Sequence, residues 1–260
     1  MLRRLKAAGV HLLISLIIFS LIIGLFLHFF YPWPYYEING LFQGLRITAG
    51  VDIILGPLLT ALVFAAGKSR RALRFDFSMI ALVQIGALAY GIVTLYAQRP
   101  YISAFLDRGF QTVRVSDLKL DPALRAHIEQ LHGQAAVQPP LLAVRPPKDG
   151  EEGAMMFITE MTSSGFPAEF TSRLEPVTAH WAQIVPAALA LPAKLPADRQ
   201  SIVDEFVKAH QIALPDLALF PLKGPFEERM VAFTRKDGQF VGYLNLEPGN
   251  YGSAAPRKHG

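Results

Sequence analysis

Three long apolar stretches lie within the first hundred residues, at about 10–31, 45–66 and 75–97. Each approaches or exceeds the roughly 20 residues that a helix needs to cross a hydrocarbon core of about 30 Å. The basic start MLRRLK also suits a signal peptide. The first stretch is longer than the ~7–15 apolar residues of such a peptide, and no small-residue cleavage site follows it. The sequence therefore predicts three transmembrane helices.

Charge is distributed unevenly around these stretches. The chain has 25 Lys and Arg against 21 Asp and Glu, and residues 1–97 alone hold eight basic and three acidic residues. The basic residues gather at the N-terminus and in the 68–74 loop, so they indicate membrane topology and predict no nucleic-acid partner. The positive-inside rule places both segments in the cytoplasm. Three spans then place the chain from residue 99 onward on the extracytoplasmic side.

The remaining sequence has the patterning of an ordinary α+β domain. Helical spacing of apolar residues predicts helices over 120–133, 151–165 and 196–212. A short apolar run between prolines at 138–147 predicts an edge strand. Two alternating segments around Lys236-Asp237-Gly238 predict a hairpin over 229–248. The expected fold is a transmembrane domain (1–98), an α+β domain with a small, mainly antiparallel sheet (99–250) and a disordered tail (251–260).

Asp52 is the most unusual residue of the apolar stretches. A charged group inside a span costs about 2.5–3.5 kcal/mol or more, so it needs a partner. Asp52 lies roughly 10 Å below the outer end of the second span at 1.5 Å per residue, and Tyr90 lies at a similar depth in the third. We therefore predict that the Tyr90 hydroxyl donates to Asp52. A structural hydrogen bond, docking of a partner and proton transfer all stay open as the purpose.

Other polar or irregular residues of the spans complete the set of candidate contacts. Gln84 lies too deep for Asp52 and is better matched in depth to Thr60. Pro57 should kink the second span and free a backbone carbonyl. Arg99, together with Asp52 and Tyr90, is the polar set that a membrane enzyme would need at the outer interface.

Signals of catalysis and cofactor binding are weak. The chain has no cysteine and seven histidines without metal-ligand spacing. It has no H-E-x-x-H, G-x-S-x-G or phosphate-loop motif. An aspartyl protease within the membrane needs two facing acids, and the nearest other acid, Asp76, lies at the far end of the third span. The sequence predicts no catalytic residue, no metal and no cofactor.

The ordered motifs of the first 115 residues resemble the type IV pilin accessory family (TfpX/TfpZ-like). They are YPWPYY at 31–36, VDIILGPLLT at 51–60, Lys68, Asp76, Gln84, Tyr90-Gly91 and Arg99-Pro100. The resemblance implies a bacterial inner-membrane protein with a periplasmic domain. It further implies a type IV pilin as partner and a role in pilin stability, assembly or surface display. It carries over no catalytic residue.

Competing functions also fit three spans followed by an extracytoplasmic domain. The main alternative is a membrane-anchored sensor or scaffold for another cell-envelope assembly. A membrane enzyme would need a fuller polar set than Asp52, Tyr90 and Arg99. A transporter would need several copies to form a pathway. Self-association of the chain within the bilayer stays open.

Overall fold

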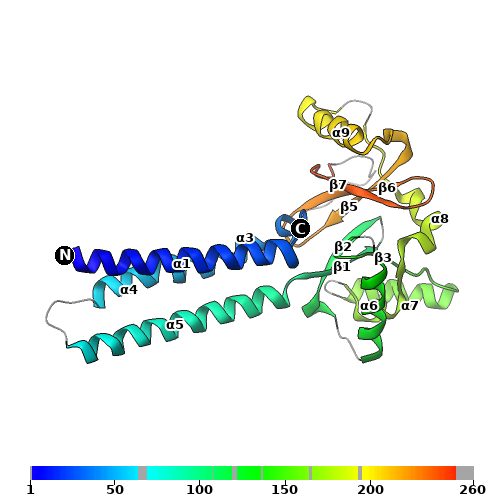
Figure 1. Cartoon of the computed structure of the whole chain (residues 1–260). Coiled ribbons are helices and arrows are strands. Elements are labelled where there is room, and N and C mark those ends of the chain that lie inside the picture. Colours follow the sequence, from blue (N-terminus) through cyan, green and yellow to red (C-terminus); the bar gives the residue numbers. More distant parts are fainter. Residues whose placement is uncertain are drawn as a thin grey trace. The chain divides into compact units, whose positions relative to one another are not determined.

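The computed structural model describes residues 2–63, 69–106, 108–118, 122–135, 137–163, 166–192 and 195–249, without the side chains of 2–4, 47, 48, 51 and 168. Lys68 and the predicted tail at 251–260 lie outside the described residues. The chain divides into two compact units, Met1–Arg99 and Pro100–Gly260 (Figure 1). Each unit is described by itself.

Two long helices, α1 (Leu2–Phe29) and α5 (Arg70–Ala97), form most of the first unit. Their apolar parts, Leu5–Phe29 and Arg70–Ala97, have mean hydropathies of 2.8 and 1.9 and are long enough to cross a membrane. The Ser69 hydroxyl caps α5 by accepting a hydrogen bond from the amide of Ala72 at 3.2 Å. Two of the three predicted spans are thus present as long apolar helices.

The segment between them is helical but irregular. After the short α2 (Tyr35–Ile38), the chain runs through α3 (Leu41–Ala49), the π-helical η1 (Gly50–Leu55) and α4 (Gly56–Val63). Among the described residues of this segment, the apolar helix is Asp52–Val63, which is shorter than a full span. Membrane crossing by the second stretch therefore stays a prediction.

The π-helical turn stands where the sequence predicts a kink. Pro57 has no amide hydrogen and its ring crowds the carbonyl one turn earlier, so regular α-helical bonding cannot continue through it. The structure shows a π-helix that ends at Leu55, directly before Gly56-Pro57. The irregularity places Asp52 inside a π-helical turn.

The second unit is built on one seven-stranded sheet with the order β4-β3-β1-β2-β5-β6-β7. The strands are β1 (Pro100–Leu106), β2 (Gly109–Arg114), β3 (Leu141–Val144), β4 (Leu174–Pro176), β5 (Leu217–Lys223), β6 (Glu228–Thr234) and β7 (Phe240–Leu244). β1 pairs with β3 and β2 with β5 in parallel, and the other neighbours are antiparallel. Four of the six strand pairs are antiparallel, so the sheet is mainly antiparallel as predicted, but it has seven strands and two parallel pairs and is larger than the small sheet that the sequence predicts.

Helices and short 3-10 turns connect these strands (Figure 1). The α-helices are α6 (Pro122–Gln134), α7 (Gly150–Thr162), α8 (Trp181–Ile184) and α9 (Ala197–His210). The 3-10 turns are η2 (Val115–Asp117), η3 (Ala168–Arg173), η4 (Val177–His180), η5 (Val185–Ala187) and η6 (Leu214–Asp216).

In this unit the predicted helices and the hairpin agree with the structure better than the predicted place of a strand in the sheet. The predicted helices at 120–133 and 196–212 are α6 and α9, and the hairpin is β6–β7. The helix at 151–165 is α7, which ends earlier, at Thr162. The predicted edge position of the proline-flanked strand is wrong, because β3 lies between β1 and β4.

Side-chain alternation along the strands builds a core on both faces of the sheet. One face carries Ile102, Ala104 and Val113 in a cluster with Ile128 and Leu131 of α6. Further along this face, strands β5 to β7 pack against Val203 and Phe206 of α9. The opposite face holds the rings of Phe105, Phe110, Phe220 and Phe233, joined by Trp181 of α8. Phe110 and Phe220 are fully buried.

The turn of the β6–β7 hairpin packs against this aromatic cluster. Gly238 has a φ of 71°, and a Cβ placed there would lie 2.5 Å from the indole of Trp181. The indole is held in place, because its Nε1 donates to the carbonyl of Arg235 at 2.9 Å. A side chain at 238 therefore meets both backbone strain and a rigid neighbour.

We expect Gly238→Ala to lower the free energy of unfolding by at least about 1–3 kcal/mol, because alanine disfavours this conformation and would displace the indole. Denaturant unfolding of the full chain in detergent, followed by tryptophan fluorescence, measures the change. Gly133→Ala in α6 is the matched control, since open space surrounds that glycine. It should be neutral or stabilise by up to about 1 kcal/mol. Equal stability of Gly238→Ala and the wild type would contradict this account.

Candidate functional site

Aromatic and cationic contacts tie α1 to α5 at the C-terminal ends of both helices. The Tyr31 hydroxyl donates to the carbonyl of Leu95 at 2.9 Å, which satisfies an acceptor near the end of α5. The Phe30 and Tyr96 rings meet edge to face at 5.2 Å. The Arg99 guanidinium lies 3.7 Å from the centre of the Tyr96 ring and donates to the Tyr96 carbonyl at 2.7 Å. These contacts are called the aromatic clamp below.

Toward their N-terminal ends, α1 and α5 line a groove, which is also lined by η1 and α4. Its volume is about 610 Å³, within the ~300–1,000 Å³ typical of ligand clefts. Most of its lining is apolar: Ala7, Val10, Ile14, Ile18, Phe77, Ala81, Ile85 and Leu88. We call this space the helix groove. It is the candidate functional site of the first unit.

Six polar side chains also line the helix groove: Lys6, His11 and Ser15 of α1, Asp52 of η1, Thr60 of α4 and Gln84 of α5. His11 Nδ1 lies 2.7 Å from the Thr60 hydroxyl, which joins α1 to α4. The Gln84 carboxamide lies against Gly56, where a Cβ would come within 1.9 Å of its nitrogen and 3.1 Å of His11 Nε2. Thr60 is 1% exposed, and its contact with His11 is partly buried. The lack of a side chain at Gly56 makes this approach of α5 to α4 possible.

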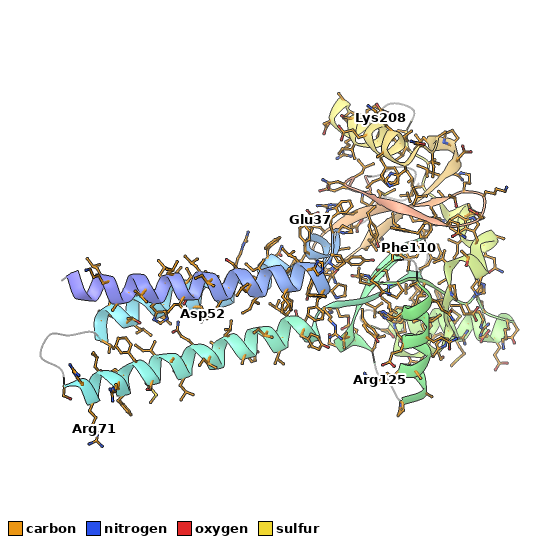
Figure 2. All side chains as sticks on the ribbon, viewed as in Figure 1. Glu37, Asp52, Arg71, Phe110, Arg125 and Lys208 are labelled. Atoms are coloured by element: carbon orange, nitrogen blue, oxygen red, sulfur yellow. The ribbon has the colours of Figure 1, made fainter. Side chains whose placement is uncertain are left out.

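Asp52 lies in the same groove and is 7% exposed. Figure 2 shows it in the region between α1 and α5. Its Oδ1 atom is buried and has no hydrogen-bond partner among the described residues. His11 is near enough to act on the carboxylate electrostatically. Asp52 is thus a buried acceptor beside a space that could hold another molecule.

The predicted hydrogen bond from Tyr90 to Asp52 is not formed. The Tyr90 side chain is 75% exposed on α5 and is absent from the groove lining. The depth count began at residue 45, whereas the helical segment begins at Leu41, and the π-helical turn changes the rise and direction of the helix after it. Gln84 and Thr60 both line the groove, and the hydrogen-bond contact of Thr60 is with His11.

Two other candidate residues, Pro57 and Arg99, do not line the groove. Pro57 follows the π-helical turn in α4 and shapes the wall of the groove without lining it. Arg99 belongs to the aromatic clamp, so it does not join Asp52 in one polar set. No described group of three or more His, Cys, Asp or Glu residues could hold a metal ion.

His11 is the groove residue that sequence reasoning missed. Its spacing to other histidines, which is the criterion for a metal ligand, carries no information about contacts between helices. A usable signal is present on α1 itself. His11 and Ser15 are four residues apart and thus share a helix face with Ile14 and Ile18. Polar residues on one face of an otherwise apolar span mark a side that meets other helices.

The second unit exposes one apolar surface, on α7. Met155, Phe157, Ile158 and Met161 are each more than half exposed. Exposed apolar groups of this kind, especially methionine, are typical of adaptable contact surfaces. Ion pairs fix the base of the helix: Glu152 Oε1 lies 2.9 Å from Arg145 and 2.7 Å from Arg173. The Glu152 carboxylate also accepts from the amide of Lys148.

The first unit combines two helices long enough to span a membrane with a groove lined by both of them. Similarity to known proteins identifies the class of protein to which the chain belongs. A family model described as "Fimbrial assembly protein FimB" matches residues 1–40, which include α1 and the following aromatic turn. A fimbrial assembly protein of Dichelobacter nodosus, serogroups C1 and C2, is 34% identical over 116 residues, or 45% of this chain and 88% of that protein.

Two further relatives from the same organism agree. The fimbrial assembly proteins of serogroups I and E1 are 34% and 31% identical over 148 and 147 residues, which is 56% of this chain in each case. The matches span 57% of the length of those two proteins. No solved structure matches the chain. The chain belongs to the fimbrial assembly protein family, which confirms the resemblance to type IV pilus accessory proteins.

The Glu152 ion pairs generate a pH prediction. The hydrogen bond from Arg145, followed by that from the Lys148 amide, lowers the pKa of Glu152 from 4.5 to about 2. A lowered pKa in the folded state stabilises the fold above the unfolded pKa, and this stabilisation is lost as pH falls through the folded value. We therefore expect Glu152→Gln to be less stable than the wild type at pH 6, with the difference shrinking between about pH 4.5 and pH 2.

Denaturant titrations of the full chain in detergent at a series of pH values measure this difference. Glu205→Gln on the exposed side of α9 is the matched control, since its nearest hydrogen-bond contact is Ser201 at 3.4 Å. The control should track the wild type at every pH. A Glu152→Gln deficit that is constant from pH 6 to pH 2 would show that lost packing, not the charge, is responsible.

Proposed function

We propose that the protein is an inner-membrane accessory factor of type IV fimbrial assembly that acts by binding pilin. The helix groove is the observation that carries the proposal. It is an apolar, elongated space between two helices long enough to span a membrane, and it suits an apolar helix of a membrane-held subunit. Membership of the fimbrial assembly family supplies the process in which the subunit takes part.

The proposed placement has three spans, with the helical segment from Leu41 to Val63 crossing between α1 and α5. These elements follow one another without a break. Arg70, Arg71 and Arg74 stand at the start of α5 and favour a cytoplasmic position for that end. The second unit is then periplasmic, where it meets the part of the pilin outside the membrane. The role is binding and holding of a subunit, without catalysis.

Membrane placement can be measured with single cysteines, because the natural chain has none. Arg71→Cys places a single thiol at an exposed position at the start of α5, and Lys236→Cys places one at an exposed position in the β6–β7 turn. With three spans, a membrane-impermeant maleimide labels Cys at 236 in intact spheroplasts and labels Cys at 71 only after lysis. If the middle segment does not cross, the second unit changes sides and the two labelling results exchange.

Binding can be measured by photocrosslinking in native membranes. A photoreactive residue at Ile14, which lines the groove, should yield an adduct with pilin. The same residue at Leu21, which is 68% exposed on α1 and outside the groove lining, is the matched control and should yield much less. Capture of a different envelope protein from the groove would favour the sensor or scaffold function. Capture of a second copy of the chain would indicate self-association instead.

A further inference from the structure

The polar residues of the helix groove leave one acceptor without a donor. His11 is engaged with Thr60, and the Gln84 carboxamide lies against Gly56 beside His11. The Asp52 side chain is buried, with 7% exposure, yet its Oδ1 atom has no hydrogen-bond partner among the described residues. In a bilayer no water is at hand to replace the missing hydrogen bond, so such a carboxylate needs a donor from elsewhere.

The position of Asp52 is also conformationally special. It lies within the π-helical turn η1, and such turns occur often at functional sites. The turn and Asp52 belong to the groove wall that α1 and α5 flank. The irregular backbone therefore brings the unpaired acceptor to the space in which a partner would lie.

The dimensions and lining of the groove favour a helix over a lipid as the occupant. Along α1 the lining runs from Lys6 to Ile18, which is about 18 Å, or more than three helical turns. An acyl chain could cover the apolar wall, but it has no hydrogen-bond donor for Asp52. An apolar helix with a single hydroxyl, amide or amine group could satisfy both the wall and the carboxylate.

We propose that Asp52 is the recognition point of the groove: it accepts a hydrogen bond from one donor group on the membrane helix of the bound fimbrial subunit. This inference rests on the proposed function and adds the chemistry of selection to it. Apolar contacts along the groove hold a helix of suitable shape. The donor opposite Asp52 distinguishes the subunit from other apolar helices and fixes its depth.

The test measures the yield of pilin adduct from a photoreactive residue at Ile14 in native membranes, using full-length variants that accumulate normally. Asp52→Leu removes the acceptor at similar volume and should lower the yield about three- to tenfold, the range of hydrogen bonds between membrane helices. Asp52→Asn keeps one acceptor oxygen and should retain more of the yield. Ala81→Trp fills the groove and should abolish it, whereas Ala89→Trp on the exposed side of α5 is the control.

Two outcomes separate the inference from the proposed function. Equal pilin yield from the wild type and Asp52→Leu overturns the role of Asp52 and leaves pilin binding intact. No pilin adduct from the wild type overturns the proposed function, and adducts with lipid alone do the same.

A second measurement remains decisive if Asp52→Leu does not accumulate. Each donor on the pilin membrane helix is replaced by leucine in turn, against wild-type and Asp52→Asn backgrounds. One replacement should lower the yield with the wild type and have a smaller effect with Asp52→Asn, as expected for two groups in contact. Yields that are insensitive to every replacement would overturn the proposal.

Discussion

The aromatic clamp is the constraint on which the helical unit depends. It fixes α1 and α5 at one end through the hydrogen bond from the Tyr31 hydroxyl to the Leu95 carbonyl and through the edge-to-face contact of the Phe30 and Tyr96 rings, while the Arg99 guanidinium packs on the Tyr96 ring. Because the contacts lie at that end, the opposite ends of the two helices are free to stand apart over α4. A groove with exposed apolar walls would be costly in water, since exposed apolar patches of this extent associate or collapse. In a bilayer the same groove carries little cost, because lipid chains can fill it. The clamp and the groove are thus complementary: one end of the unit is committed to its own packing, and the other leaves a groove lined by both helices.

The sequence was informative about the candidate site, although only in part. It identified Asp52 as the residue that needs an explanation, because the cost of a carboxylate in a span does not depend on the details of the fold. It also matched Thr60 with Gln84 by depth; both residues line the groove, but Thr60 contacts His11 and Gln84 lies against Gly56. The partner of Asp52 could not be found in this way, because a depth count assumes regular helices with known ends. The π-helical turn before Pro57 breaks that assumption, and helix rotation placed Tyr90 outward. His11 was overlooked for a related reason, since its meaning depends on which helix faces it.

A similar division holds in the second unit. Elements with local signals, such as α6, α9 and the hairpin around Gly238, can be derived from spacing and turn chemistry alone. The central strands cannot. β1 begins at Pro100, shortly after the long apolar helix α5, and β5 contains Pro221, which argues against a central strand. Pro221 lies just outside the β2–β5 pairing, which covers Phe110 with Leu222 and Gln111 with Lys223, and it packs against Gly109, where a Cβ would come within 2.9 Å of the Pro221 carbonyl. These contacts join residues more than a hundred positions apart. No window along the sequence contains such information.

The composition of the helix groove has a consequence for how a subunit could be chosen. In water an apolar groove attracts any apolar helix, whereas in a bilayer the lipid chains are as apolar as leucine, and apolar contact alone discriminates little. Selectivity must then come from shape and from the few polar groups. His11 and Thr60 satisfy each other, and Gln84 is positioned by the absence of a side chain at Gly56, so their geometry belongs to the resting fold. Asp52 alone among these four has a buried atom without a donor. A single unsatisfied acceptor is a suitable device for a temporary hold: it raises affinity for a helix with a matching donor without making the contact so strong that the subunit cannot leave for the growing fimbria.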